Sequence, residues 1–150
     1  MANSAGLCTS FKLELMLADH NFGTSSATRG STSADSFKMS LYQTSASISP
    51  STTAYTASGE VSSANYTAGG AAVTNGTAPT TSGTTAYWTP SASVSWTTVT
   101  FTTDCTLLYN STRSNKAVGS YTFSSQTVTA GNFTLTMPVN AAGTALIQIA

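Results

Sequence analysis

The sequence predicts an all-β protein with a single domain, either a jelly roll or a β-sandwich. Ser and Thr make up roughly a third of the 150 residues, and Thr, Val, Tyr and Phe favour strands. Short runs in which apolar and polar residues alternate recur along the chain, separated by Gly, Pro and Asn turn signals. Hydrophobic residues reach 40% while the net charge is zero, which favours a folded chain over a disordered one.

The N-terminal residues are expected to form an arm. Residues 1–10 are small and mostly polar, so we predict a loose arm before a single β domain over residues 11–150. Residues 21–36 are polar, contain two Gly and show no apolar period, which indicates a long loop.

The first apolar run, residues 11–17, supports two interpretations. Its apolar residues alternate with Lys12 and Glu14, as in a strand. Leu7, Phe11 and Leu15 also recur at helical spacing, and Lys, Leu, Glu and Met are good helix formers. We favour a short helix at the start of the domain, and the strand stays open as the alternative.

The remaining elements follow from alternation in runs of three to eight residues. We predict strands within 36–43, 60–66, 71–75, 94–103, 107–109, 117–123, 133–137 and 145–149. In the first of these, Phe37, Met39 and Leu41 should face the core, and Lys38, Ser40 and Tyr42 the solvent. Late in the chain, Phe133, Leu135 and Met137 should be core residues of one strand.

Turn residues separate these runs. Asn75-Gly76 is the strongest hairpin signal in the chain. Residues 110–115 (NSTRSN) should close a second hairpin between flanking strands. Ser49-Pro50 and Gly69-Gly70 mark turns in the first half of the chain.

The scarcity of charge is the main functional clue. Lys plus Arg is 5, Asp plus Glu is 5, and charged residues make up 7% of the chain, whereas a typical domain has about 25%. Ten charges must serve a folded surface of about 7,000 Å², and a separate monomer usually keeps more for solubility. We therefore predict a chain packed into a larger assembly. The alternative is a stable extracellular-type β domain with a Ser/Thr coat.

Several partners are disfavoured by the same composition. Nucleic acid would demand a basic stripe, which a chain with zero net charge lacks. No run of 18 apolar residues occurs, so we expect no membrane span. Residues 1–10 have neither a basic start nor an apolar centre, so we do not expect them to be a signal peptide.

Candidate catalytic groups are few, and we predict no enzyme, no cofactor and no metal. His20 is the single histidine, and Asp19 could orient its ring, but no motif fixes a nucleophile beside it and a metal needs three or four ligands. We expect a hydrogen-bonded structural histidine. A glycosidase pair could be drawn from the carboxylates only by folding, because nothing in the sequence marks one. These carboxylates are Glu14, Asp19, Asp35, Glu60 and Asp104.

Cys8 and Cys105 are the only cysteines. Without an export signal, we expect two reduced, buried thiols, and a single disulfide is the alternative.

Two further patterns have structural explanations. Asn-X-Ser/Thr sequons occur at Asn65, Asn75, Asn110 and Asn132, a number close to chance in a chain this rich in Ser and Thr. Aromatic residues could form a sugar-stacking platform, but in a β domain of this size they more often belong to the core or to an interface. They are Tyr55, Tyr66, Tyr87, Trp88 and Trp96.

Several segments together resemble a family of small virion structural proteins of tailed bacteriophages. The resemblance covers most of residues 11–150 and lies in the order and spacing of short motifs: FKMSLY at 37–42, TAY at 53–55, GEV at 59–61, Tyr66 with Gly69-Gly70, LYNST at 108–112, SNKA at 114–117 and GNFT at 131–134 with Pro138. Residues 18–22 (ADHNF) are similar to a stretch that follows a helix in such proteins, and the insert at 23–35 departs from their pattern.

The resemblance implies a capsid decoration (cement) protein that binds the outer shell and stabilises it. The implied partners are the major capsid protein and further copies of the chain, as a dimer or trimer on a symmetry axis. The protein would be made in the cytoplasm of a host bacterium and reside on the virion. The alternatives are a tail, adaptor or head-fibre component, and a glycan-binding module on the virion surface. We expect residues 1–10 and the loop 21–35 to make much of the shell contact, because an extended arm can add main-chain hydrogen bonds without charge.

Overall fold

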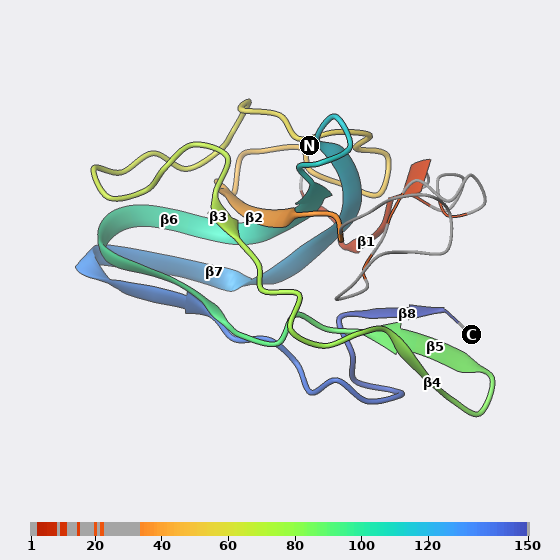
Figure 1. Cartoon of the computed structure of the whole chain (residues 1–150). Helices are drawn as coiled ribbons and strands as arrows, with labels where there is room; N and C mark the ends of the chain where they lie inside the picture. Colours follow the sequence, from red (N-terminus) through yellow and green to blue (C-terminus); the bar gives the residue numbers. More distant parts are fainter. Residues whose placement is uncertain are drawn as a thin grey trace.

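The protein is an all-β sandwich of two antiparallel sheets. The structure, a computed structural model, describes residues 3–8, 10, 11, 15, 20, 22 and 34–149. Within them, one sheet has five strands in the order β1-β7-β6-β2-β3, and the other has three in the order β4-β5-β8 (Figure 1). The predicted all-β fold is thus confirmed.

The eight strands of the described residues differ greatly in length. They are β1 (Gly6–Leu7), β2 (Phe37–Tyr42), β3 (Ala71–Ala72), β4 (Thr80–Ser82), β5 (Thr85–Trp88), β6 (Val94–Asn110), β7 (Lys116–Leu135) and β8 (Ile147–Ile149). β6 has 17 residues and β7 has 20, and they pair with each other over most of their length. In the described part of the chain, no helix is long and apolar enough to cross a membrane.

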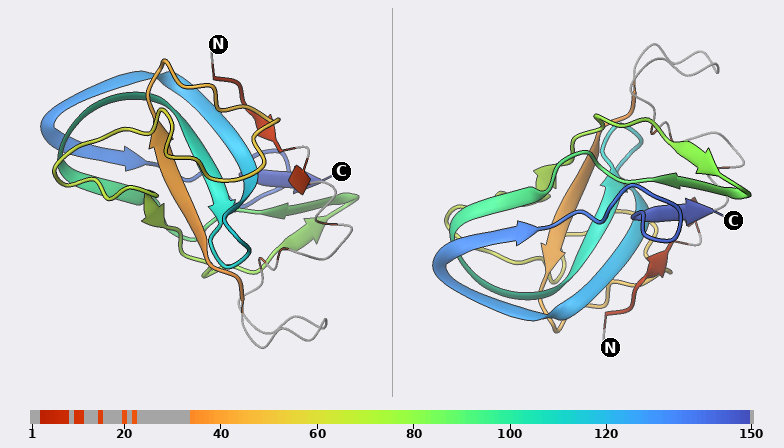
Figure 2. Two further views of the ribbon diagram at one scale, coloured as in Figure 1. Left: turned by 90° about the horizontal axis from the view of Figure 1, so that it is seen from above. Right: turned by 90° about the horizontal axis from the view of Figure 1, so that it is seen from below.

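The β6–β7 hairpin is one bent ribbon where the sequence predicted separate strands. Its turn follows Asn110, as predicted, but residues 124–132 continue β7 although they carry almost no apolar period. Register shifts occur at several points, and Thr98 and Ala130 adopt positive φ angles of 53° and 46°. Bulges bend and twist a ribbon, and the curl is visible from both sides in Figure 2.

The inside of this bend is lined by aromatic rings. Trp96 and Phe133, on paired strands, have ring centroids 6.1 Å apart, and Phe101 meets Phe133 edge to face at 5.5 Å. Phe133 is buried, as predicted, whereas Leu135 and Met137 are only half-buried against the core. The buried face of β7 therefore ends at Phe133, earlier than the alternation predicted.

Both faces of β2 are buried, where one solvent face was predicted. Ser40 and Tyr42 are both fully buried. The loops of 43–70 cover them, since Tyr42 Oη donates to Thr56 O (2.8 Å) and Ser40 Oγ donates to Tyr42 Oη (3.2 Å). The alternation correctly placed Ser40 and Tyr42 on the second face of β2. That face is nevertheless buried, because the 43–70 loops cover it.

Two predicted elements in the middle of the chain are wrong. Residues 60–66 form no strand, only a single bridge between Glu60 and Tyr42. Asn75-Gly76 is not a hairpin turn, because Asn75 Nδ2 donates to Asp35 O and Gly76 N to Ser91 Oγ. The two-residue hairpin loop is Gly83-Thr84, which joins β4 and β5.

The N-terminal residues 3–8 lie against the large sheet, and Gly6–Leu7 form its edge strand β1. Gly6 and Leu7 pair with Ser120 and Gly119 of β7, and Cys8 N donates to Val118 O. A main-chain strand pairing of this kind uses the hydrogen-bonding groups that an arm would offer to a shell. Of the short helix predicted in the run 11–17, Phe11 and Leu15 are described and both are helical, and the rest lies outside the described residues, as does most of the loop 21–35.

Candidate functional site

His20 belongs to a buried polar network. Its Nδ1 lies 3.0 Å from Asn110 Nδ2, which also donates to Asp35 Oδ2 (2.9 Å). Asp35 in turn accepts from Arg113 Nε (3.3 Å). His20, Asp35 and Asn110 are 8%, 3% and 0% exposed. Asp19, which could orient the His20 ring, lies outside the described residues.

The geometry fixes the tautomer of the histidine. Asn110 Oδ1 accepts from the backbone N–H groups of Thr112 and Arg113, so its Nδ2 must face His20. An amide N–H₂ can only donate, and therefore Nδ1 of His20 accepts and its neutral ring carries the proton on Nε2. The network ties the first element of the domain to the β6–β7 turn, which is a structural role.

A second network surrounds Glu60, which is 8% exposed. Its Oε1 accepts from Tyr66 Oη (2.7 Å) and Gly69 N (2.8 Å), and its Oε2 accepts from Tyr55 Oη (2.7 Å). Tyr66 Oη also accepts from Leu41 N (2.9 Å), and Tyr109 Oη donates to Gly69 O (2.7 Å). We call this group, with the adjacent Tyr42, the tyrosine clamp; it holds the 43–70 loops on β2 and β6.

The clamp tyrosines resist ionisation. Burial first, with a smaller effect from the charge of Glu60, raises the pKa of Tyr42 to about 12. The same two causes raise the pKa of Tyr109 to about 12. For Tyr55 and Tyr66, burial first and the bond to Glu60 next raise the pKa further still. Neutral hydroxyls that donate to a carboxylate suit a structural clamp and offer no general base near pH 7.

The other ionisable candidates lie apart from these networks. Asp104 accepts from Asn3 Nδ2 (2.8 Å) and so helps to hold the edge strand β1. Glu14 lies outside the described residues. Over 34–149 and the few described residues before it, no three His, Cys, Asp or Glu side chains come together as metal ligands.

The two cysteines are buried thiols rather than half-cystines, as expected. Burial raises the pKa of Cys105 to about 12, and the nearby Asp104 adds to the effect. A thiol of this kind is inert as a nucleophile at neutral pH.

The sequons do not behave as one set. The Asn110 side chain is wholly buried and fully bonded, so a glycan could not be attached to it without unfolding the turn. Asn65 and Asn132 are exposed; Asn65 donates from the covering loops to Thr98 O, and Asn132 accepts from Thr98 N across the bent ribbon.

The five aromatic residues that could have formed a sugar platform belong instead to the clamp, the core and a pocket, and Tyr66 contacts Trp96 at a ring-centroid distance of 5.9 Å. Tyr55 and Tyr66 belong to the tyrosine clamp, and Trp96 belongs to the core inside the bend. Trp88 and Tyr87 line a pocket described next.

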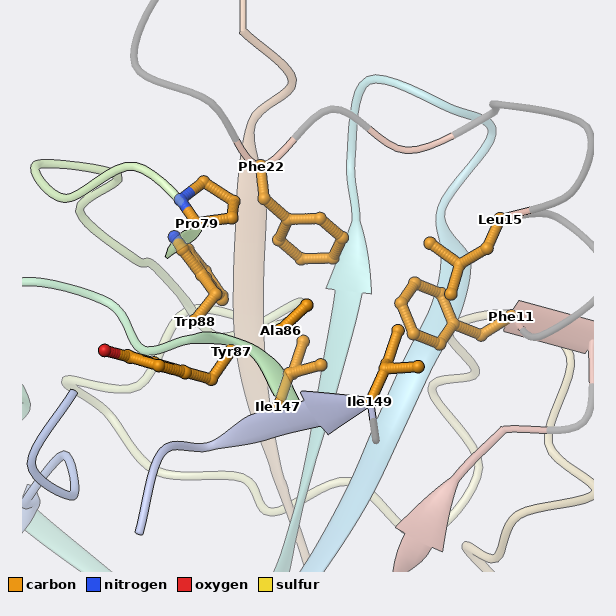
Figure 3. A pocket seen from close by; sticks show the side chains of 9 residues that line it. All are labelled: Phe11, Leu15, Phe22, Pro79, Ala86, Tyr87, Trp88, Ile147 and Ile149. Atoms are coloured by element: carbon orange, nitrogen blue, oxygen red, sulfur yellow. The ribbon is translucent and has the colours of Figure 1, made fainter. Parts of the chain in front are cut away.

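The apolar pocket is the concave site that the sequence did not reveal. It lies between the small sheet and the N-terminal segment and has a volume of about 160 Å³ (Figure 3). Its lining residues are Phe11, Leu15, Phe22, Pro79, Ala86, Tyr87, Trp88, Ile147 and Ile149.

Strand register explains how the pocket is built. Ala86 pairs with Ile149 and Trp88 with Ile147, and these two cross-strand pairs form one wall. Phe22 contacts Trp88 at a ring-centroid distance of 4.8 Å and also lines the site. The Tyr87 hydroxyl points away from the cavity in Figure 3, and Trp88 Nε1 donates a hydrogen bond to Thr77 O (3.0 Å). The cavity thus offers no polar group for chemistry and can only bind an apolar group.

No protein-family model matches the chain, and neither a curated protein nor a solved structure shows a significant match to it.

Sequence reasoning found half of the pocket. The alternation of Ala145, Ile147 and Ile149 was recognised as a strand, but its neighbour β5 was not, because only Tyr87 and Trp88 in it are large. A long-range pairing was needed to bring β5 and β8 together.

Proposed function

We propose that the chain is a structural protein of a bacteriophage virion, a decoration protein that binds the outer capsid shell and stabilises it. Under this proposal, the protein has no enzymatic activity and binds no cofactor. Its partners are the major capsid protein and further copies of the chain, as a dimer or trimer on a symmetry axis. The protein is made in the bacterial cytoplasm and resides on the capsid surface.

One observation carries this proposal. The three described carboxylates, Asp35, Glu60 and Asp104, are all engaged in internal bonds, so the exterior of the described residues carries few charges and is rich in hydroxyls, amides and backbone. On β6 and β7 the exposed positions are largely Ser and Thr, and some pair across the ribbon, such as Ser95 with Thr134 (2.9 Å). Such a surface suits neighbours packed at many neutral contacts in a symmetric shell.

The copy number in purified virions tests the location. A decoration protein should be present in hundreds of copies, whereas a tail, adaptor or head-fibre protein should be present in far fewer. Quantitative mass spectrometry of intact virions gives this number directly. A low count, or absence from the virion, contradicts the decoration role.

Addition of the recombinant protein to shells that lack it tests the activity. We expect saturable binding and a higher temperature of shell disruption, because a ligand that binds only the assembled shell stabilises it by mass action. Binding without any stabilisation would contradict a cementing role.

A glycan-binding role is a second candidate, and a hollow on the bend of β7 favours it. The hollow presents neutral amides and hydroxyls beside an aromatic ring, including Gln126, Asn132 and Phe123. Binding on a glycan array that Asn132→Ala abolishes would support this role, and an empty array would count against it.

A further inference from the structure

The shell contact required by the proposed function has to be made with little charge. Of the described basic side chains, Arg113 is paired with the buried Asp35. Of the arm residues 3–8, which could have added a strand to the shell, Gly6 and Leu7 are paired with β7 and Ser4 N donates to Ile48 O. A docking surface on this chain therefore needs apolar contacts, and the energy of such contacts is concentrated in a few side chains that fill pockets.

The apolar pocket has the properties of such a site. None of its nine lining residues carries a charge. Its mouth lies at the protein surface, since Pro79 and Ala86 are exposed and Ile149 is 45% exposed. Val139, at 72%, is more exposed than Ile149, but it lines none of the hollows described here.

The size of the pocket limits what can fill it. Apolar cavities of about 150 Å³ stay dry and bind one benzene ring, and this pocket has a volume of about 160 Å³. An aromatic ring or a branched alkyl group fits, while an acyl chain or a helix face does not. Burying such a group removes apolar surface from water on both partners.

We propose that the apolar pocket is the anchor site of the shell contact and receives one uncharged, apolar side chain, of Leu or Phe size, from the capsid protein. The inference rests on the proposed function for the identity of the partner. The size and polarity of the bound group rest on the pocket alone.

The first experiment tests the pocket in the isolated protein, with benzene as the probe. Trp88 lines the cavity, so benzene binding should change its fluorescence in a Trp96→Phe variant, which leaves Trp88 as the only tryptophan. Ala86→Leu fills the cavity and should weaken benzene binding about tenfold or more, which corresponds to ~1.4 kcal/mol. Ala72→Leu, on the exposed strand β3 away from the pocket, is the matched control and should bind as the parent does.

Failure of folding in a variant does not remove the test. Saturating benzene should raise the unfolding temperature of the unmodified protein, because it binds only the folded state. If benzene does not bind, the pocket does not accept an apolar group and the inference is wrong, whatever the protein does in the virion.

The second experiment tests the partner, with undecorated shells. We expect Ala86→Leu to lower shell affinity about tenfold or more, Ala72→Leu to leave it unchanged, and benzene to compete with the shell. If Ala86→Leu binds shells as tightly as the unmodified protein, the anchor assignment is wrong while the decoration role stands. If the unmodified protein does not bind shells, the decoration role fails, and the capsid protein is excluded as the source of the side chain.

Discussion

The tyrosine clamp and the apolar pocket show two ways in which a chain with few charges builds structure. The clamp takes one of the five acidic residues, Glu60, and buries it beneath loops with a full set of donors. The pocket lies on the small sheet and contains no polar group that points into it. In the clamp, hydrogen bonds from side chains fix the irregular backbone of the 43–70 loops. In the pocket, the paired strands β5 and β8 position the apolar side chains of one wall.

The difference lies in how each region would respond to change. A buried carboxylate is tolerated because its bonds compensate for lost hydration, so the loss of any partner is expensive. Substitution in a partly exposed apolar wall should lower the free energy of unfolding only slightly, because its side chains already contact water. Stability should therefore depend strongly on the clamp and weakly on the pocket rim, while ligand binding should show the opposite dependence.

Substitution of Glu60 should give the largest effect. Glu60→Ala leaves the hydroxyls of Tyr55 and Tyr66 and the N–H of Gly69 without their acceptor. We expect a loss of about 3 kcal/mol in the free energy of unfolding, since each bond to a charged group contributes about 1.5–3 kcal/mol and the site can partly relax. Urea denaturation measures this loss.

Glu60→Gln is the matched control. Its amide oxygen can still accept from Tyr66 and Gly69, so it should cost clearly less than Glu60→Ala. A loss below about 1 kcal/mol for Glu60→Ala would show that the clamp does not hold the loops.

Alkaline pH should have the second-largest effect, because it weakens the clamp. In the unfolded chain, tyrosine ionises near its usual pKa of 10.0, but in the folded protein the pKa of Tyr42 is about 12. Between these values the folded state binds more protons than the unfolded state, so stability falls as pH rises. The contribution is complete below pH 10.0 and is lost toward pH 12 and beyond, because Tyr55 and Tyr66 are raised further.

Urea midpoints measured across this alkaline range test the sign. Tyr66→Phe removes one of the raised groups, so its stability should start lower and then fall less steeply with pH. A midpoint that rises or stays flat above pH 10.0 would contradict the assignment.

The sequence predicted regular structure well where one strand alternates, and poorly where tertiary cover decides. β2 was located to within a residue at each end, but its supposed solvent face is buried beneath the 43–70 loops. Residues 124–132 looked like a break because exposed strand positions carry Ser, Thr and Gln. Asn75-Gly76 fits a hairpin turn locally, yet side-chain and backbone bonds to Asp35 and Ser91 take precedence.

The sites were harder to predict than the strands for the same reason. His20, Asp35 and Asn110 meet across sequence separations of up to 90 residues, and no local pattern marks such a contact. In the sequence, Asp19 was considered as a residue that could orient the His20 ring, because it is the adjacent residue. Contacts between distant residues cannot be read from a sequence in this way. The apolar pocket likewise exists only once β5 and β8 are paired.

The smallest effect on stability is expected at the pocket rim. Ile149→Ser removes a side chain that is 45% exposed, so it forfeits only part of the burial energy of an isoleucine, about 1 kcal/mol or less. Ile147→Ser, on the same face of β8 but 5% exposed, should cost about 3 kcal/mol, because it leaves a cavity and buries a hydroxyl. The pair shares one strand, one chemistry and one substitution, so thermal or urea unfolding of both isolates burial as the cause. Equal losses at the two positions would mean that the pocket wall is as tightly packed as the core, and the contrast between rim and clamp would not hold.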